Sequence, residues 1–443
     1  MTIHKKIWKA LIKAGYETYL VGGAVRDMVM NKTPKDYDLA TIATPDQIKE
    51  IFNNAKFVGE SFGVCLVDGI EVATFRVDHS FGSAKDTKVE FTANIFEDLA
   101  RRDFTMNAMA LAYDGTIIDP FDGQKDIKDR IIRFVGHGDL RIAEDANRMI
   151  RACRFCTLGF VLEDYTKESI ISAVNTGAVK KITPERIRIE ILKAMKMNTP
   201  SLFWSALLET GILKEVFPEL VDAYGHDHGN YHEEDVWTHL MIAGDRVSPK
   251  FPLTRLAAFL HDVGKPASFD ENTGSFHEHQ HFGADITRTR LTSLKFSNEE
   301  TRHVVNLVLV HMDGTRRMSA KAVRRLKKKL HAYGLDWHDY VRVRIGDRAG
   351  NIARPDFTLS DIKAYVKHFT SENEIPFTTH HLAVSGAEII KHFGLHPGPI
   401  VGKIQREMLK YVIEEGSGVN NKTDLINYIN NILYSCENRD VVD

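Results

Sequence analysis

The sequence has few of the features that mark secreted and membrane-spanning proteins. Its 443 residues include only four cysteines, too few and too scattered for the disulfide framework of a small secreted domain. No apolar run reaches the roughly 18 residues that a membrane span requires, and the first residues lack the apolar core of a secretory signal. These absences predict a cytoplasmic protein that has no membrane partner.

The sequence also lacks an excess of charge of either sign. Lys and Arg number 58 against 60 Asp and Glu, a net charge of −2, so a nucleic-acid partner is indicated only by local clusters of charge. Hydrophobic residues make up 43% and charged residues 27%, which excludes a disordered or fibrous chain. At roughly 100–200 residues per domain, the length predicts two to four domains.

The hydrophobic pattern changes near Leu140. Short alternating or β-branched runs before this point predict strands mixed with helices, and longer periodic runs after it predict mostly helices. We place further boundaries near Tyr224 and Gly350, which gives the segments 1–140, 141–223, 224–350 and 351–443. The predicted strands are Thr18–Val21, Val64–Val67, Glu71–Val77 and Ile117–Ile118. The predicted helical stretches are Ile142–Leu158, Thr183–Lys196, Phe203–Leu208, Thr301–Val310, Ser319–Leu330 and Gly402–Glu414.

Two glycines, Gly22 and Gly23, separate the end of a predicted strand from the start of a predicted helix that carries Arg26. Glycine lets backbone N–H groups approach a phosphate closely, and a helix N-terminus favours negative charge. Arg26, one turn into the helix, is placed to contact a phosphate oxygen. Taken alone, the pattern is more typical of a tight turn, and it matches neither the dinucleotide-binding fingerprint nor the Walker motif.

Two aspartates, Asp36 and Asp38, follow after a short spacer. In a strand both side chains project from one face, and two adjacent carboxylates are costly unless a cation lies between them. Hard cations such as Mg²⁺ take one or two carboxylates together with substrate phosphates. By itself, Asp-x-Asp is more typical of a charged strand start at the surface.

In combination, these motifs resemble a known family. Gly-Gly-x-x-Arg-Asp followed by Asp-x-Asp is similar to the opening signature of polymerase-β-like nucleotidyltransferases, and RRDFTMNA (101–108) and EDANRMIR (144–151) follow in the right order. From Tyr19 to about Phe160 the chain resembles the tRNA nucleotidyltransferase (CCA-adding) and bacterial poly(A) polymerase family. The resemblance implies an α+β fold class, in which a catalytic head of mixed sheet and helices precedes all-helical neck, body, HD and tail domains.

The resemblance also implies two-metal phosphoryl transfer. Asp36 and Asp38 would hold two Mg²⁺ ions that clamp the attacking 3′-hydroxyl and the leaving pyrophosphate. For a third carboxylate the candidate is Glu71, with Asp103 as the alternative, and Glu71 is equally consistent with an exposed strand carboxylate. Two glycines of the turn, Gly22 and Gly23, would lie at the nucleotide.

Other parts of the head are assigned by the same resemblance. Arg102 resembles a family residue that contacts the nucleotide, and Asp78 to Glu90 resembles the mobile loop between the two catalytic segments. In the family, the helix that carries Asp145 and Arg148 selects cytosine and adenine, because an acceptor beside a donor can distinguish base edges. The alternative for this pair is an i,i+3 ion pair on a solvated helix.

Two arginines further along the same predicted helix, Arg151 and Arg154, are expected to neutralise nucleotide phosphates or to brace the head domain. The same stretch contains a lone Cys-x-x-Cys, in which Cys153 lies between the two arginines and Cys156 follows them. Because no second pair is present, we expect these cysteines to be buried small hydrophobic residues and not zinc ligands.

Half of the histidines lie in one short part of the chain: ten of 20 fall between His226 and His311. A buried Asp beside a His is expensive unless a metal ion or a hydrogen bond compensates it. The order His, His-Asp, His, His and Asp resembles the HD phosphohydrolase superfamily, whose side chains hold one or two divalent transition metals that activate water. Residue by residue, the predicted metal ligands are His239, His261, Asp262, His279, His311 and Asp347.

A basic stretch follows the histidines. Arg316 to Lys329 carries eight basic residues on a predicted helix, and phosphate contacts dominate affinity for nucleic acids. Arg324, Arg325, Lys327 and Lys328 are therefore predicted to contact RNA, with a solvated helix face as the equally weighted alternative.

Together these features predict addition of C, C and A to the 3′ end of tRNA from CTP and ATP, with a metal-dependent phosphatase or 2′,3′-cyclic phosphodiesterase as a further activity. The alternatives are a CC-adding, A-adding or poly(A) polymerase relative, of which the HD segment disfavours the last, or an HD phosphohydrolase with an inactive RNA-binding head. The sequence makes no prediction of the oligomeric state.

Overall fold

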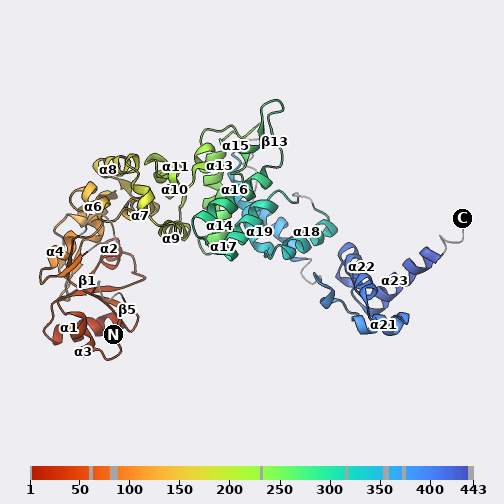
Figure 1. The fold of residues 1–443 in the computed structure, drawn as a ribbon, viewed down its shortest axis with the longest axis horizontal. Helices are drawn as coiled ribbons and strands as arrows, with labels where there is room; N and C mark the ends of the chain where they lie inside the picture. Colours follow the sequence, from red (N-terminus) through yellow and green to blue (C-terminus); the bar gives the residue numbers. More distant parts are fainter. Residues whose placement is uncertain are drawn as a thin grey trace. The chain divides into compact units, whose positions relative to one another are not determined.

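The computed structural model describes residues 2–58, 63–79, 88–229, 233–314, 318–352, 359–371 and 376–437. The chain forms two compact units, Met1–Val221 and Asp222–Asp443, which Figure 1 colours red to yellow and green to blue. Residues 80–87 of the predicted mobile loop, and Arg316 and Arg317 of the basic stretch, lie outside the described residues.

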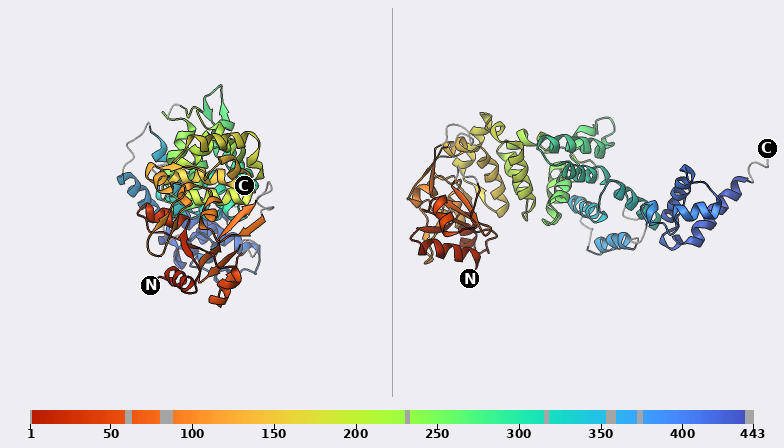
Figure 2. Two further views of the ribbon diagram at one scale, coloured as in Figure 1. Left: turned by 90° about the vertical axis from the view of Figure 1, so that its left-hand side faces the viewer. Right: turned by 60° about the horizontal axis from the view of Figure 1, so that its bottom comes forward.

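A seven-stranded mixed sheet is the centre of the first unit, and Figure 2 shows it in the red-to-orange part of the chain. Its strand order is β3-β4-β5-β2-β1-β8-β9, in which only β2 and β5 run parallel among the pairs described. The strands are β1 (Thr18–Val21), β2 (Asp38–Thr41), β3 (Lys56–Phe57), β4 (Val64–Val67), β5 (Ile70–Thr74), β8 (Ala110–Leu111) and β9 (Ile117–Ile118). Three pairs lie outside it in the chain: β6 (Arg76–His79) with β7 (Lys88–Phe91), β10 (Ile131–Ile132) with β11 (Val161–Leu162), and β12 (Phe269–Asp270) with β13 (Ser275–Phe276).

The register of the sheet brings three sequence motifs to one edge. Val21 at the end of β1 pairs with Asp38 at the start of β2, so Gly22 follows directly beside Asp38. Leu39 of β2 pairs with Val72 of the parallel strand β5, which places the preceding residues, Asp38 and Glu71, side by side. Val21 of β1, Ala40 of β2 and Phe75, which follows β5, are buried in one hydrophobic cluster that holds the edge in place.

Helices cover this sheet and, with the strand pairs β6–β7 and β10–β11, form most of the rest of the first unit. Local signals account for several starts: Thr44 caps α3 in a capping box with Gln47, Asn94 caps α4, and Pro184 occupies the first turn of α9. The helices are α1 (Ile3–Lys13), α2 (Gly23–Val29), α3 (Pro45–Ile51), α4 (Ile95–Ala100), α5 (Gly123–Asp129), α6 (Gly138–Glu144), α7 (Asn147–Phe155), α8 (Asp164–Asn175), α9 (Pro184–Met195), α10 (Ser201–Glu209), α11 (Ile212–Val216) and α12 (Pro218–Asp222).

Three predicted elements differ from the observed ones. The strand Glu71–Val77 is two strands, because the chain changes its pairing partner at Phe75: β5 pairs with β2 and β4, whereas β6 pairs with β7. The helix Ile142–Leu158 is broken at Asp145, which is extended (φ −152°, ψ 100°) and separates α6 from α7. Asp36 lies two residues before β2, so Asp36 and Asp38 do not both project from a strand.

Within its described residues, the second unit contains helices and one strand pair, the β12–β13 hairpin. Helix α13 packs against α14 and α19, and α16 packs against α17. A second hydrophobic cluster, which includes Val384, Met408 and Leu425, joins the last three helices. The helices are α13 (Val236–Arg246), α14 (Pro252–Leu260), α15 (Lys265–Ser268), α16 (His279–Ser293), α17 (Asn298–Val310), α18 (Ala320–Ala332), α19 (Trp337–Gly350), α20 (Leu359–Thr370), α21 (Gly386–Phe393), α22 (Pro399–Glu415) and α23 (Lys422–Glu437).

The basic helix α18 does not present all of its predicted RNA contacts to solvent. Arg324 and Lys327 are 6% and 3% exposed; Arg324 Nε donates to Ile413 O at 2.6 Å, and Lys327 Nζ donates to Phe369 O at 2.5 Å. These two side chains fasten α18 to α22 and to the end of α20, so their assignment to RNA is wrong. Arg325 is exposed and paired with Glu414, and Lys328 is exposed.

Cys153 and Cys156 are buried free thiols, as expected of small core residues. Among the helices of the described ranges, none combines the length and the apolar character needed to cross a bilayer.

Candidate functional sites

The sheet edge in the first unit opens into a strongly basic cavity. Its volume is about 640 Å³, and its wall carries eight arginines and lysines against four aspartates and glutamates. Such an excess of positive charge suits a polyanion like a nucleoside triphosphate. The cavity is lined by Gly22, Gly23, Arg26, Asp38, Arg101, Arg102, Asp103, Asn107, Asp145, Asn147, Arg148, Arg151, Arg154, Phe155, Arg186, Ile189, Glu190 and Lys193.

The turn between β1 and α2 needs glycine at Gly22. This residue has φ 69° and ψ −134°, a backbone conformation that residues with a Cβ atom avoid. A Cβ added there would lie 3.2 Å from Nη1 of Arg102. Gly22 therefore lets the backbone approach both Asp38 and the arginine that the sequence assigned to nucleotide binding.

Gly22→Ala is expected to weaken nucleotide binding and to lower the free energy of unfolding by about 1–3 kcal/mol, because the new Cβ strains the backbone and displaces Arg102. Thermal unfolding and nucleotide titration would measure the two effects. Gly69→Ala is the matched control, since Gly69 also has positive φ (84°) but has no atom within 4 Å of the added Cβ. Equal nucleotide binding by both variants would contradict the assigned role of Gly22.

Three carboxylates gather at the sheet edge. Asp38 is half-buried, and burial together with the nearby charges of Glu71 and Asp36 raises its pKa to about 6, against an opposing effect of Arg102. Such crowding of negative charge is what a bound divalent cation would relieve, so the residues fit the metal that the family resemblance implies. Their oxygens do not form one of the tight three-residue groups found among the described residues.

Asp103, the alternative third carboxylate, already has a partner. It accepts hydrogen bonds from Nη2 of Arg151 at 2.5 Å and from Nδ2 of Asn107 at 3.0 Å. Although burial acts to raise its pKa, Arg151 and Asn107 lower the pKa to about 2. The geometry therefore favours Glu71, which lies beside Asp38, over Asp103 as the third carboxylate.

The predicted nucleotide-binding arginines line the cavity, and each is held by an acidic residue. Arg26 Nη2 lies 2.6 Å from Asp27, and Arg102 Nη2 lies 2.9 Å from Asp98. Arg154 pairs with Glu190 of α9 and lies over the Phe155 ring. These pairs fix the guanidinium groups in place while leaving the cavity positively charged.

Asp145 and Arg148 both face the cavity, although they do not share a helix. The Asp145 carboxylate accepts two hydrogen bonds from Arg186, at 2.8 and 2.6 Å, and one from the Asn147 N–H at 3.0 Å. Arg148 pairs with Glu144 and donates to the Arg101 carbonyl at 2.9 Å. An acceptor and a donor are thus held at fixed positions, as the reading of a base edge requires.

Sequence reasoning missed the contribution of α9 to this cavity. Arg186, Ile189, Glu190 and Lys193 recur at helical spacing and present one face of α9 to it. The stretch was predicted as a helix, but nothing in its pattern distinguishes a cavity wall from an ordinary charged face. Only the packing of α9 against α7 reveals it.

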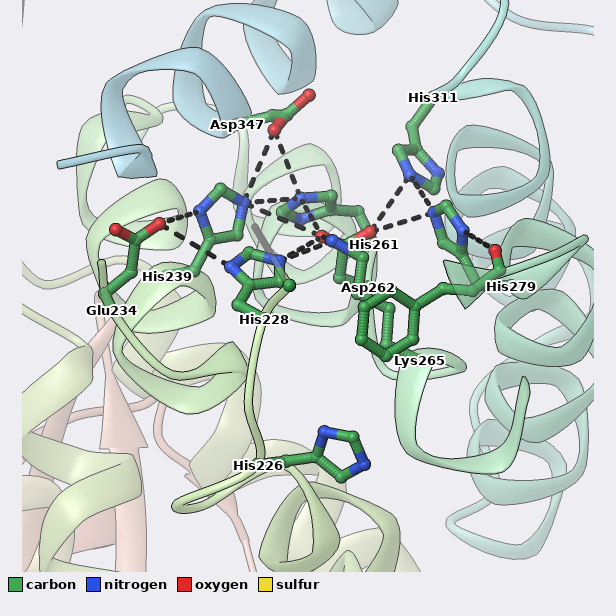
Figure 3. Close-up of polar contacts among 12 residues, drawn as sticks. His226, His228, Glu234, His239, His261, Asp262, Lys265, His279, His311 and Asp347 are labelled. Carbon is green, nitrogen blue, oxygen red and sulfur yellow. Dashed lines mark hydrogen bonds and ion pairs between the residues drawn. The ribbon is translucent and has the colours of Figure 1, made fainter. Parts of the chain in front are cut away.

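The second site lies in the helical bundle of the second unit, where the six predicted metal ligands converge (Figure 3). His239 comes from α13 and Asp347 from α19, while His261 and His311 directly follow α14 and α17. The remaining ligands are Asp262, beside His261, and His279 at the start of α16.

Asp262 lies between two groups of donor atoms. In the first group, the Nε2 atoms of His239 and His261 are 3.1 Å apart and lie 3.3 and 3.6 Å from Asp347 Oδ1. In the second group, the Nε2 atoms of His279 and His311 are 3.3 Å apart and lie 3.1 and 3.2 Å from Asp262 Oδ1. Asp262 Oδ2 points to the first group, 3.5 Å from His261 Nε2, so one carboxylate serves both.

The other ring nitrogens fix the orientation of the histidines. The Nδ1 atoms of His261, His279 and His311 lie 2.8, 3.0 and 2.6 Å from backbone carbonyl oxygens, which can only accept. In these three histidines the hydrogen is therefore on Nδ1. His239 Nδ1 also faces an acceptor, Glu234 Oε1, at 3.3 Å. Each Nε2 is left facing the centre, as in histidines that bind metals.

Converging lone pairs of this kind need a cation. Burial acts to lower the pKa of His239, but hydrogen bonds to Asp347 and Glu234 raise it to about 9, so a proton can supply the charge. Burial lowers the pKa of His311 to about 4, which leaves its Nε2 lone pair directed at the centre. Two groups of imidazole and carboxylate donors that share Asp262 fit two divalent transition metals.

A close contact between helices places Asp347 here. A Cβ added to Gly346 would lie 2.6 Å from the Ala243 carbonyl oxygen, so only glycine permits α19 to cross α13 at this distance. The contact puts Asp347 against His239, one turn before Ala243.

Three residues of this centre were missed by the sequence analysis: His228, Glu234 and Lys265. His228 and Glu234 lie in the segment before α13, and Lys265 begins α15. His228 was among the ten clustered histidines, but no motif separated it from the others. Its contact with Asp262, at 3.1 Å, joins residues 34 positions apart and depends on tertiary packing.

Comparison with known proteins agrees with the order of these sites. Residues 18–133 match the model of the poly A polymerase head domain, residues 159–224 match the probable RNA and SrmB-binding site of polymerase A, and residues 230–343 match the HD domain.

The chain is also similar to individual proteins. It is 42% identical over 212 residues to a CCA-adding enzyme of Geobacillus sp. (strain WCH70) and 38% identical over 216 residues to that of Bacillus subtilis (strain 168). These matches cover 46% and 47% of this chain and only 52% and 54% of those relatives. An A-adding tRNA nucleotidyltransferase of Deinococcus radiodurans is 32% identical over 407 residues, 88% of this chain and 90% of that protein.

Solved structures show the same architecture. The crystal structure of the Bacillus stearothermophilus CCA-adding enzyme in complex with CTP is 26% identical, covers 98% of this chain and 100% of its own, and has a TM-score of 0.68. The Thermotoga maritima CCA-adding enzyme complexed with tRNA is 19% identical, covers 97% and 94%, and has a TM-score of 0.58; at this identity it supports the fold alone.

Proposed function

The chain belongs to the tRNA nucleotidyltransferase family, and we propose that it adds C, C and A to the 3′ end of tRNA, with CTP and ATP as donors. The 3′-hydroxyl oxygen forms a bond to the α-phosphorus of the nucleotide, the bond to the bridging oxygen of pyrophosphate breaks, and the hydroxyl proton passes to water. The observation that carries the proposal is the single basic cavity that joins the Asp38 edge to the Asp145 and Arg148 pair.

Each wall of this cavity has a role in the proposal. Asp38 of the cavity wall, with the nearby Asp36 and Glu71, would hold Mg²⁺, which when bound activates the hydroxyl and neutralises the leaving pyrophosphate. Arg26, Arg102, Arg151 and Arg154 supply positive charge toward the triphosphate. Asp145 accepts from the exocyclic amino group that cytosine and adenine share, and Arg148 donates to the ring edge.

The experiment is a nucleotide-incorporation assay on tRNA that lacks its 3′ end, with CTP and ATP supplied singly and together. CCA addition predicts two residues from CTP alone and three from both. Incorporation of one A only on tRNA that already ends in CC would instead identify an A-adding enzyme. That alternative is supported by the full-length similarity to the Deinococcus radiodurans protein.

Asp145→Ala is expected to reduce discrimination against UTP and GTP by about 1–3 kcal/mol, roughly 5- to 150-fold, because the acceptor for the exocyclic amino group is lost. Comparing kcat/KM for all four nucleotides measures this effect. Lys193→Ala, which removes a cation of α9 from the same cavity, is the control, and we expect it to change kcat/KM equally for every nucleotide. An equal loss for all four with Asp145→Ala would contradict the base-reading role.

We further propose that the HD centre hydrolyses phosphate monoesters or 2′,3′-cyclic phosphates. The two donor groups that share Asp262 would hold two divalent transition metals, which when bound lower the pKa of water. A water oxygen would then form a bond to phosphorus while the ester P–O bond breaks and the leaving oxygen takes a proton. His261→Ala should abolish hydrolysis of such substrates if the centre is the active site.

The division into head (1–140), neck and body (141–223), HD domain (224–350) and tail (351–443) remains our proposed assignment. Of the predicted RNA contacts, only the exposed side chains of Arg325 and Lys328 remain available for phosphates. Arg325 would have to exchange Glu414 for a phosphate on binding.

A further inference from the structure

The HD centre contains a third group of converging donor atoms, made by His228, His239 and Asp262. The His228 side chain is fully buried, and its Nε2 lies 3.1 Å from Asp262 Oδ2. The same oxygen lies 3.8 Å from Nε2 of His239. His239 Nε2 and Asp262 Oδ2 also face the first group, so His228 Nε2 is the donor that this third group adds, as Figure 3 shows at its centre.

A lysine side chain reaches into this third group. Lys265 Nζ lies 2.8 Å from Asp262 Oδ2 and 2.5 Å from His228 Nε2, and only 10% of the lysine side chain is exposed. An ammonium group donates three hydrogen bonds and accepts none, so His228 must accept with the lone pair of Nε2. The ammonium therefore lies between an imidazole nitrogen and a carboxylate oxygen, the donors that bind divalent transition metals.

Local structure keeps the ammonium at this position. Lys265 starts α15 three residues after Asp262, and its N–H donates to the Asp262 carbonyl at 3.0 Å. The side chain also lies against the Phe276 ring, with Nζ 5.5 Å from the ring centroid. The Lys265 cation is thus tethered one turn from the carboxylate that it neutralises.

We propose that Lys265 is a built-in cation that occupies a third cation position of the HD centre, beside His228 Nε2 and Asp262 Oδ2, so that the protein binds two metal ions and excludes a third from these two donor atoms. The inference rests on the proposal that the other two donor groups bind metal. The tethered ammonium costs no association entropy and repels a third ion, which explains why His228 and Asp262 Oδ2 can be buried so close together.

The test is the number of metal ions bound per chain. Lys265→Met removes the charge but keeps a long unbranched side chain, and we expect it to bind one ion more than the wild-type protein after equilibration with Co²⁺ or Mn²⁺. Elemental analysis gives the count, and with Co²⁺ the extra ion should add to the visible absorption. Lys265→Arg retains a cation and should keep the wild-type count.

A second pair of variants tests the donor. His228→Phe introduced into the Lys265→Met protein should return the count to that of the wild type, because the third group loses its imidazole. His226→Phe in the same background is the control and should leave the extra ion bound. His226 lies on the same segment as His228, but its ring packs against those of Phe269 and Phe276, with centroid distances of 5.4 and 6.0 Å.

Thermal unfolding gives a further readout. Lys265→Met should unfold at a lower temperature without metal, because Asp262 and His228 lose a cation, and added metal should restore the stability. A metal count equal to that of the wild type, or a loss of stability that metal does not restore, would overturn the inference. A wild-type protein that binds no metal would instead overturn the proposed metal centre itself.

Discussion

Asp38→Asn is expected to lower the rate of nucleotide incorporation on the order of 10³-fold while leaving tRNA binding intact. The substitution removes the carboxylate beside Glu71 at the sheet edge, and a bound metal contributes several kcal/mol to stabilising the transferred phosphoryl group, about a factor of ten for each 1.4 kcal/mol. Single-turnover incorporation at saturating CTP would measure the rate, and a gel-shift titration would measure the affinity for tRNA.

The loss of activity should not come from loss of structure. Because burial, Glu71 and Asp36 raise the pKa of Asp38 to about 6, the ionised side chain is disfavoured in the fold, and Asn should leave the unfolding temperature unchanged or raise it. Asp114→Asn, an exposed turn residue between β8 and β9 of the same sheet, is the control and should incorporate normally. If Asp38→Asn incorporates nucleotides at the wild-type rate, the assigned metal site is wrong. The alternative, an HD phosphohydrolase with an inactive RNA-binding head, would then be favoured.

Asp262→Ala is expected to remove metal binding at the HD centre and with it all hydrolysis of phosphate esters. This carboxylate is the residue that both donor groups share, with Oδ1 at 3.1 Å from His279 and Oδ2 at 3.5 Å from His261. Without it, the facing imidazoles lose their common anion, and neither group retains enough charge to compete for a divalent ion. Metal content and phosphatase assays would measure the two effects.

The two units supply controls for one another. Asp262→Ala should keep full nucleotide incorporation, just as Asp38→Asn should keep the metal content of the HD centre. Asp285→Ala, on the exposed surface of α16 with 82% of its side chain accessible, should change neither. Hydrolysis that persists in Asp262→Ala at the wild-type rate would show that the activity does not arise at this centre.

The histidine centre shows which residues of a site sequence motifs identify and which they do not. The resemblance of His239, His261-Asp262 and Asp347 to the HD superfamily implied that these side chains meet, and the cost of burying an Asp beside a His without a partner agreed with it. The partners His228 and Lys265 were not predicted, because they hold their positions through contacts with Asp262 and belong to no periodic pattern.

In the basic helix α18 the positive charges were identified correctly, but two of the side chains that carry them point into the protein and not to solvent. Arg324 and Lys327 are spaced three residues apart, beside the buried Val323 and Leu330, so they lie on the buried side of the helix. Their long apolar stems pack inward while their donors reach carbonyl groups at Ile413 and Phe369. Composition does not distinguish such donors from phosphate-binding ones, because both carry the same charge.

Residue order, together with the family resemblance of its motifs, was enough for the α+β class, for some of the strands and helices, for the family and for the chemical groups of both sites, because periodicity and motif spacing are local properties of the chain. Folding in three dimensions was needed for the rest: the pairing of Asp145 with Arg186, the wall formed by α9, and the ammonium of Lys265 among the metal ligands. Each of these contacts depends on how the helices pack and orient their side chains. No local pattern in the sequence specifies that packing.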